Sequence, residues 1–269
     1  QKAVQEAVAN AVQKWQTNAK QQAEARKNAK IYEDILPSKR ALEKHNANGS
    51  SPVKTYSVDV NIGRLDELPS LFSRIFKKNE LKHSNLLLKA AFIAMQDIPS
   101  ANAKWVDNHI RLFKKVDANI DIYSEGEEMS TRIPLLKDTT SKGLKELVDF
   151  MESLELIRST DLNENDRNEN DSNENDNNSG TFSFHDCTKL NVKRFSPALR
   201  NNQACALSVG SPYQCVLPND DEESEIPYIT TKVVTATLVC DDRVLDKSKA
   251  VEWIGNFKFN VENPVKLFL

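Results

Sequence analysis

The chain has 269 residues, of which 39% are hydrophobic and 28% are charged, proportions typical of a folded globular protein with one or two domains. A formal net charge of -3 and an isoelectric point near 5.9 exclude a global basic field, so neither nucleic acid nor an anionic membrane is expected as a partner. No stretch approaches 18 uninterrupted apolar residues, which excludes a membrane-spanning helix. Because the chain begins with Gln1 and no signal-peptide pattern follows, we expect a processed or excised part of a longer protein.

The first segment, residues 1–36, is rich in Ala, Gln and Lys and contains neither Pro nor Gly. Strong helix formers and a narrow apolar stripe predict a linker or arm with helical tendency. The alternative is a helix that docks on a partner through Trp15. Pro37 marks the boundary to an expected core domain over residues 37–269.

The first half of this core domain mixes strand and helix patterns. Alternating apolar residues predict strands over residues 55–62 and 116–123. Helical spacing predicts a largely buried helix over residues 84–97, capped near Ser84, and an amphipathic helix over residues 144–156.

The composition then changes sharply. Residues 160–179 contain three copies of N-E-N-D and almost nothing apolar, so burial cannot offset the entropy of ordering, and we predict a disordered acidic insertion. A calcium-binding loop is the alternative, but the segment lacks the glycine and the terminal glutamate spacing of an EF-hand. A second acidic run over residues 220–225 predicts a solvated loop between strands.

The second half is rich in strands. Strand patterns occur at residues 181–184, 204–210 and 230–240, followed by a helical stretch over residues 248–264 and a short apolar tail. Because no helical patterns separate the late strands, the order favours a mixed α/β domain with one large sheet over a doubly wound parallel fold.

The four cysteines form no C-x-x-C pair, and the four histidines are scattered, so neither a zinc site nor a disulfide scaffold is expected. We expect buried or idle thiols in a reducing compartment, and no metal ion or cofactor bound by this chain. The cysteines are Cys187, Cys205, Cys215 and Cys240.

Several motifs carry a family resemblance over about residues 53–269. Residues 180–210, GTFSFHDCTKLNVKRFSPALRNNQACALSVG, resemble the G-T-F-T-I-S-N-L-G … Q-A-C-I-L-A-V-G stretch of the dihydrolipoamide acyltransferases, the catalytic cores of the 2-oxo acid dehydrogenase complexes. LVCDDRVLDKSKA resembles the active-site motif S-C-D-H-R-V-V-D-G-A of that family. NLLLKAAFIAMQDIPSANAKW and the final NFKFNVENPVKLFL match further family segments. The resemblance implies a sandwich like that of chloramphenicol acetyltransferase, with one large mixed sheet flanked by helices, and a trimer.

Two substitutions fall on the residues that carry the chemistry of the family. Where the family has the His that takes a proton from a thiol, this chain has Asp242, and where the family has the Ser that stabilises the oxyanion, it has His185. An ordinary thiol has a pKa near 8.5 and an ordinary carboxyl group one near 3.9, a mismatch of about 4–5 units or roughly 6 kcal/mol against proton transfer. The family Asp survives as Asp246, but the following Gly is Lys247, and two further family glycines are Thr188 and Asn191.

These departures predict that the chain is not an enzyme. The alternative is an active acyltransferase with a rearranged site, in which His185 and Asp242 meet across a subunit interface and act together. The family contains a branch without the active-site His, the dihydrolipoamide dehydrogenase-binding proteins (protein X) of the pyruvate dehydrogenase complex. The sequence resembles the core domain of that branch.

The resemblance implies a structural core subunit that joins the acetyltransferase core, trimerises, and lies in the mitochondrial matrix. Dihydrolipoamide dehydrogenase would bind through an upstream domain, and a lipoyl group would sit on another, both outside this chain. Two further functions stay open: a core subunit of a branched-chain or 2-oxoglutarate complex, and a free-standing interaction protein. The apolar tail is expected to contact neighbouring trimers, or else to fold onto its own core; it contains Val265, Leu267, Phe268 and Leu269.

Overall fold

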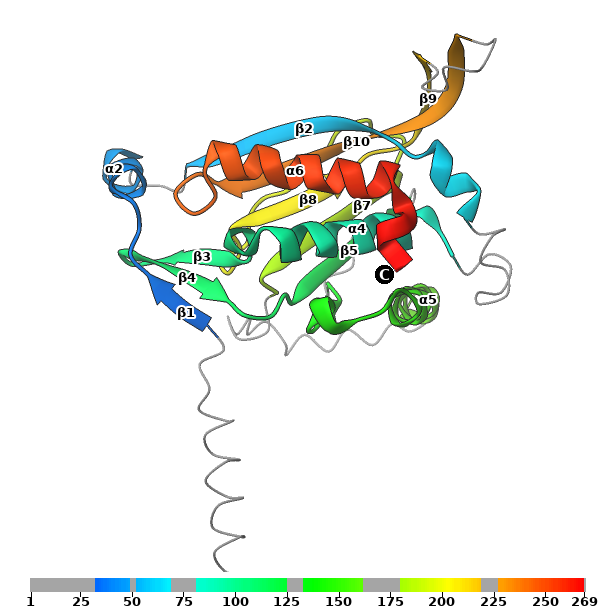
Figure 1. The fold of residues 1–269 in the computed structure, drawn as a ribbon. Helices are drawn as coiled ribbons and strands as arrows, with labels where there is room; N and C mark the ends of the chain where they lie inside the picture. Colours follow the sequence, from blue (N-terminus) through cyan, green and yellow to red (C-terminus); the bar gives the residue numbers. More distant parts are fainter. Residues whose placement is uncertain are drawn as a thin grey trace, which may run out of the picture.

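Figure 1 shows the computed structural model of the chain, which describes residues 32–48, 52–68, 81–124, 133–161, 180–218 and 227–268. Most of the predicted arm, almost all of the N-E-N-D insertion and the acidic run over residues 220–225 lie outside these ranges. No helix among the described residues is long and apolar enough to cross a membrane.

A large mixed sheet forms the body of the fold, with the strand order β2-β10-β8-β7-β5-β6. Strand β7 pairs in parallel with β5 and β8, and the other pairings are antiparallel. The prediction of one large mixed sheet flanked by helices is therefore confirmed. Its strands are β2 (Val53–Asn61), β5 (Ala118–Ser124), β6 (Leu135–Leu136), β7 (Phe182–Lys189), β8 (Cys205–Val209), β9 (Tyr213–Pro218) and β10 (Tyr228–Asp241).

Strand β10 organises this sheet because it is long enough to pair with three others. Its first residues pair with β9, and its last residues pair with β8 on one side and β2 on the other. The burial pattern follows this division, since residues 228–231 are largely exposed and residues 233–241 are buried. The β9–β10 hairpin thus projects beyond the body of the sheet (Figure 1).

Helices cover one face of the large sheet (Figure 1). Helices α4 and α6 pack against each other and, with the sheet, enclose the main core, in which Phe92, Phe182, Trp253 and Phe257 are among the largest buried side chains. Helix α5 packs against α4. The helices are α2 (Lys39–Asn48), α4 (His83–Asp97), α5 (Leu144–Asp161) and α6 (Lys247–Glu262), with short 3-10 turns η1 (Gly63–Asp66), η2 (Pro99–Ala101), η3 (Thr139–Ser141) and η5 (Pro264–Phe268).

A second, small sheet was not predicted. Its order is β1-β4-β3, and its strands are β1 (Tyr32–Ile35), β3 (Ala103–Val106) and β4 (His109–Phe113). Strands β3 and β4 are joined by the two residues Asp107 and Asn108, and Asp107 has a positive φ of 50°, the backbone that a tight hairpin of this kind requires. Within the described part of the predicted arm, residues 32–35 thus form a strand that pairs with β4.

Helix α4 begins differently from the prediction. Its N-cap is Lys82 and no side chain caps it, so Ser84 lies inside the first turn instead of capping it. Helix α5 extends to Asp161, past the predicted end at residue 156 and into the first residues assigned to the acidic insertion.

Candidate active site

The side chain of His185 lies on the face of the large sheet that points away from α4 and α6. Side chains alternate along a strand, and Phe182 and Phe184 of β7 belong to the main core, where the Phe182 ring lies 6.0 Å from that of Trp253. His185 therefore points to the opposite face. It is nevertheless only 7% exposed, and the ring of Phe195, in the segment after β7, lies 5.9 Å from the imidazole.

Two side chains of β5 hold the imidazole of His185. Asp121 is the register partner of His185 across the parallel β5–β7 pair, and Tyr123 lies two residues further along the same face. The Tyr123 hydroxyl lies 3.1 Å from Nδ1 of His185, and Oδ2 of Asp121 lies 3.6 Å from the same nitrogen. The sequence predicted His185 as a site residue but missed Asp121 and Tyr123.

This arrangement favours the His185 tautomer with its proton on Nδ1, because that N–H faces the Tyr123 hydroxyl and the Asp121 carboxylate. Burial and a hydrogen bond to Asp121 raise the pKa of Tyr123, so its phenol stays protonated and donates to the carboxylate. A phenol that donates to Asp121 can accept from an Nδ1–H of His185, and that tautomer leaves the lone pair on Nε2. Nε2 is buried and has no hydrogen-bond partner among the described residues. An oriented imidazole with a free lone pair is equipped to act as a general base.

The turn after β10 contains the other predicted site residue. Asp242 is ion-paired with Lys44 of α2, whose Nζ also donates to the Asp242 carbonyl oxygen at 2.9 Å. The Asp242 amide donates to the Pro52 carbonyl at 3.0 Å. Asp242 is thus fixed to the N-terminal part of the domain by its backbone and by its side chain.

The residues on either side of Asp242 form a buried ion pair. Asp241 is 4% exposed and accepts from Nε and Nη2 of Arg243, with the Nη2–Oδ2 distance at 2.6 Å. Nη1 of Arg243 lies 3.0 Å from Nδ1 of His45, and its guanidinium carbon lies 5.1 Å from the ring centroid of Trp105. These contacts hold α2 and β3 to the turn that carries Asp242.

Asp246 and Lys247 lie at the N-terminus of α6. Asp246 is the N-cap of α6, and its Oδ1 accepts from the Lys249 amide at 3.0 Å. Both side chains are exposed and border a cavity of about 460 Å³ together with Arg40 of α2. The contact present at Asp246 is therefore a capping bond.

His185 and Asp242 do not meet within one chain. His185 is in register with Ser208 of β8, and Ser208 with Thr237 of β10. Asp242 lies five residues beyond Thr237, which is about 16 Å along a strand, and two strand spacings of about 5 Å each separate β7 from β10. A joint action of the two side chains would therefore require a second subunit.

The residues at the two substituted glycine positions, Thr188 near the end of β7 and Asn191 in the turn after it, have local structural roles. Asn191 has a φ of 52°, so it adopts the left-handed backbone for which glycine is favoured. The amide and hydroxyl of Thr188 donate to Oδ1 of Asp186 at 3.0 and 2.6 Å. The turn is thus stabilised by side-chain hydrogen bonds instead of glycine freedom.

The residues of the apolar tail separate into different environments. Leu267 is 1% exposed and belongs to the main core, against which Phe268 also packs, whereas Val265 is 75% exposed. Leu269 lies outside the described residues. A contact with another trimer is still a prediction, and Val265 is the described apolar residue of the tail that is available for it.

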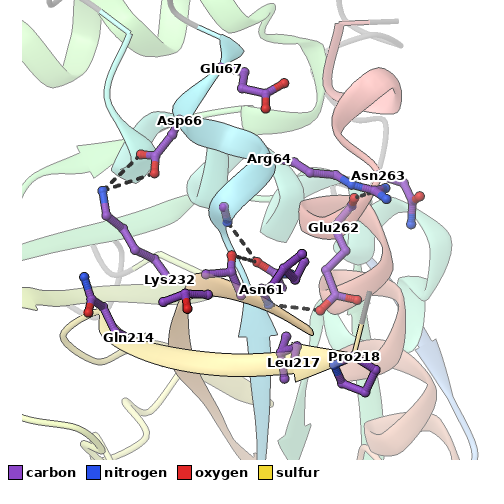
Figure 2. Close-up of a pocket in the computed structure, with 14 residues that line it drawn as sticks. Asn61, Arg64, Asp66, Glu67, Gln214, Leu217, Pro218, Lys232, Glu262 and Asn263 are labelled. Carbon is purple, nitrogen blue, oxygen red and sulfur yellow. Dashed lines mark hydrogen bonds and ion pairs between the residues drawn. The ribbon is translucent and has the colours of Figure 1, made fainter. Parts of the chain in front are cut away.

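Figure 2 shows a second, wider hollow, a cavity of about 930 Å³ between η1, the β9–β10 hairpin and the end of α6. Its charged groups are already paired, since Lys232 contacts Asp66 at 3.1 Å and the Asn61 amide donates to Glu262 at 3.0 Å. Arg64 donates to the Glu262 carbonyl. The described residues that line it include no imidazole or thiol, which leaves His185 as the better candidate for acyl-transfer chemistry.

Among the described residues, no group of three or more His, Cys, Asp or Glu side chains is arranged to hold a metal ion. All four cysteines are free thiols, and Cys187, Cys205 and Cys240 are buried.

Comparison with known proteins places these features in a family. A family model described as 2-oxoacid dehydrogenases acyltransferase (catalytic domain) matches residues 38–269. The mitochondrial dihydrolipoyllysine-residue acetyltransferase component of the pyruvate dehydrogenase complex of Dictyostelium discoideum is 30% identical over 209 residues, covering 77% of this chain and 31% of the relative. The mitochondrial pyruvate dehydrogenase protein X component of Mus musculus is 23% identical, covering 71% of this chain and 36% of the relative. The chain therefore spans about a third of the length of these relatives.

Solved structures share the fold. A probable dihydrolipoamide acetyltransferase from Listeria monocytogenes has a TM-score of 0.64 at 21% identity, covering 85% of this chain and 94% of that one. Chloramphenicol acetyltransferase has a TM-score of 0.53 at 12% identity, covering 86% of this chain and 94% of that one. The expected sandwich like that of chloramphenicol acetyltransferase is confirmed.

These comparisons contradict the prediction that the chain is not an enzyme. Relatives from Dictyostelium and Arabidopsis that are 27–30% identical to this chain are named as acetyltransferases, whereas protein X of the mouse is 23% identical. The prediction equated replacement of the His and Ser positions with loss of chemistry, but the structure contains an oriented imidazole at His185. The chain belongs to the acyltransferase (catalytic domain) family of the 2-oxoacid dehydrogenases.

Proposed function

We propose that this chain transfers acyl groups between a dihydrolipoyl thiol and coenzyme A, with His185 as the general base. The observation that carries the proposal is the His185 imidazole itself. Its Nδ1 is held by Tyr123 beside Asp121, and its Nε2 has no partner among the described residues. It occupies the position at which the family motif has its Ser, so the imidazole lies where the sequence resemblance expects the reacting acyl group.

Proton transfer favours an imidazole over the carboxylate at position 242. An ordinary imidazole has a pKa near 6.5, so a thiol with a pKa near 8.5 transfers its proton against about 3 kcal/mol, compared with roughly 6 kcal/mol for an ordinary carboxylate. Asp242 is in addition ion-paired with Lys44. His185 is therefore the better base of the two.

The reaction requires one base that accepts and returns a proton. Nε2 of His185 takes the thiol proton, the thiolate attacks the acyl carbonyl carbon, and the tetrahedral intermediate then expels the other sulfur as a thiolate. The protonated imidazole returns the proton to that leaving thiolate. Asp121, acting through the Tyr123 hydroxyl, orients the ring and stabilises the imidazolium. Nε2 is buried, so a substrate reaches it only if the groups that cover it are displaced.

The test is an acetyl-transfer assay on the purified protein with acetyl-coenzyme A and dihydrolipoamide. We expect measurable turnover that falls at least a hundredfold in H185Q, since general-base catalysis contributes about 10²–10⁴ in rate. The control is H83Q, because His83 begins α4 and pairs with Asp66 outside this site. No turnover by the wild-type protein, or equal turnover by H185Q, would overturn the proposal.

We further propose that the chain is part of the core of a pyruvate dehydrogenase complex in the mitochondrial matrix, where it forms trimers with itself or with acetyltransferase chains. The names of the relatives support this assignment. The full protein would carry a lipoyl group and bind dihydrolipoamide dehydrogenase through upstream domains, as the resemblance to protein X suggests. Co-sedimentation of the full-length protein with the acetyltransferase core and the dehydrogenase tests this; separate sedimentation would contradict it.

A further inference from the structure

Two of the four cysteines face each other across neighbouring strands of the large sheet. Cys205 begins β8, Cys240 is the next-to-last residue of β10, and the two are register partners at the end of the β8–β10 ladder. Both belong to the main core on the side of α4 and α6, where Sγ of Cys205 lies 3.5 Å from the Ala101 carbonyl oxygen. Their side chains therefore point to the same face of the sheet.

The hydrogen bonds of the ladder show what kind of pair this is. The Asp241 amide donates to the Ala204 carbonyl at 2.8 Å, which makes Asp241 and Ala204 a hydrogen-bonded pair. In an antiparallel ladder such pairs alternate with non-hydrogen-bonded ones. Cys240 and Cys205 are the next pair, so they form a non-hydrogen-bonded pair, the type in which opposite side chains lie closer together.

This geometry lies within reach of a disulfide. In a non-hydrogen-bonded pair the Cα atoms are about 4.5 Å apart and the Cβ atoms about 4.5–5.5 Å. A disulfide accepts Cα separations of about 4.4–6.8 Å and Cβ separations of about 3.5–4.5 Å. A small inward shift is therefore enough to form the bond. The other two cysteines lie elsewhere, Cys187 on β7 and Cys215 on β9.

We propose that Cys205 and Cys240 are a reversible oxidation site that closes to a disulfide when the protein meets a peroxide. One thiolate attacks a peroxide oxygen and becomes a sulfenic acid, releasing water, and the second thiol displaces a second water to form the S–S bond. Overall, the two thiols lose two protons and two electrons, and hydrogen peroxide is reduced to two molecules of water.

The position of the pair at the end of the ladder makes the reaction possible, and its burial makes it slow. Burial raises the pKa of Cys205 and raises that of Cys240 to about 12, so few thiolates form in the closed state. Cys205 and Cys240 are both 0% exposed, so a peroxide reaches them only when this end of the ladder opens. The bond would stiffen the turn that starts at Asp241, where the carboxylate holds Arg243.

The experiment counts thiols and maps the bond in the wild-type protein. The protein is treated with hydrogen peroxide, its free thiols are alkylated under denaturing conditions, and its peptides are analysed by mass spectrometry. We expect two of the four thiols to disappear, a Cys205–Cys240 linked peptide about 2 Da lighter than its reduced parts, and full recovery with dithiothreitol. Four remaining thiols, a bond to Cys187 or Cys215, or sulfinic acid formation in place of the bond would overturn the proposal.

Two matched variants distinguish oxidation of the Cys205–Cys240 pair from oxidation of any exposed or buried cysteine. C187S removes a buried thiol of β7 and should still lose two thiols, whereas C240S should lose none. If C187S abolished the loss and C240S preserved it, the proposal would be wrong. Circular dichroism of each variant establishes that it is folded, and the mapping of the wild-type protein stands even if C240S fails to fold.

Discussion

At the scale of single residues, the site depends on what holds each side chain. The motifs point to His185 and Asp242, but their contacts differ in kind. His185 keeps a nitrogen without a partner among the described residues, whereas Asp242 is held by Lys44 and Pro52. The family motif assigns the general base to position 242, but in this chain His185 is better placed than Asp242 to accept a proton.

Removing the phenol oxygen tests how His185 is oriented. In Y123F the imidazole loses its hydrogen bond at Nδ1, so the tautomer with a free Nε2 is no longer favoured. We expect kcat to fall about tenfold or more with a smaller change in KM, and the pH profile of kcat to shift. The control is Y228F, since Tyr228 is 62% exposed on β10. Equal kcat values and pH profiles for Y123F and the wild-type protein would show that Tyr123 does not position the base.

A second residue-scale prediction concerns Asp246. Its carboxylate caps α6, so D246A should destabilise the protein by about 1 kcal/mol in urea unfolding, whereas D246N should be close to the wild-type protein because Asn caps equally well. Equal stability of D246A and the wild-type protein would contradict the capping role.

At the scale of elements, α4, η1 and β10 are connected through His83 and Asp66. His83 begins α4, its Nε2 lies 3.0 Å from Asp66 of η1, and Asp66 also pairs with Lys232 of β10. Burial lowers the pKa of His83, and this effect outweighs the attraction of the Asp66 carboxylate. The folded protein thus favours the neutral imidazole.

The direction of this shift predicts a pH dependence of stability. Where the unfolded chain binds a proton at His83 that the folded protein does not, stability falls as pH decreases. We expect the free energy of unfolding to decrease as the pH falls below about 6.5, the ordinary imidazole value. The decrease should be shallower in H83Q than in the wild-type protein when both are measured by urea unfolding. A steeper decrease in H83Q would mean that the Asp66 contact dominates.

Elements with strong periodicity were predictable, and short ones were not. Helices α4, α5 and α6 and strands β2, β5, β7, β8 and β10 correspond to sequence patterns. Strands β1, β3 and β4 have four or five residues each, too few for alternation to be distinctive, although the Asp107–Asn108 turn was a usable signal. Asp121 and Tyr123 could not be assigned to the site because only the parallel β5–β7 register brings them to His185.

At the scale of the whole molecule, the fold separates the tail into a core part and an exposed part. Leu267 is buried, so L267A should cost about 2–5 kcal/mol in unfolding free energy. Truncating the last three residues would therefore mix a folding defect with any assembly defect.

V265D changes an exposed residue, and we expect it to weaken co-assembly with the acetyltransferase core at unchanged stability. Unchanged co-sedimentation of V265D would remove the tail from the assembly contacts.

The fold of the whole molecule also determines how far His185 is from Asp242. His185 lies on β7 and Asp242 in the turn after β10, and the two do not approach each other within one chain. The proposed activity therefore rests on the Asp121–Tyr123–His185 cluster, which one chain provides complete. A second subunit is needed for any contribution of Asp242.

The most direct test of the central claim is the rate of acetyl transfer from acetyl-coenzyme A to dihydrolipoamide, measured for the wild-type protein and H185Q side by side. Turnover by the wild-type protein that falls at least a hundredfold in H185Q, with H83Q unchanged, is the predicted result. A wild-type protein that is folded and shows no turnover above buffer would contradict the account, as would an H185Q variant as active as the wild-type protein.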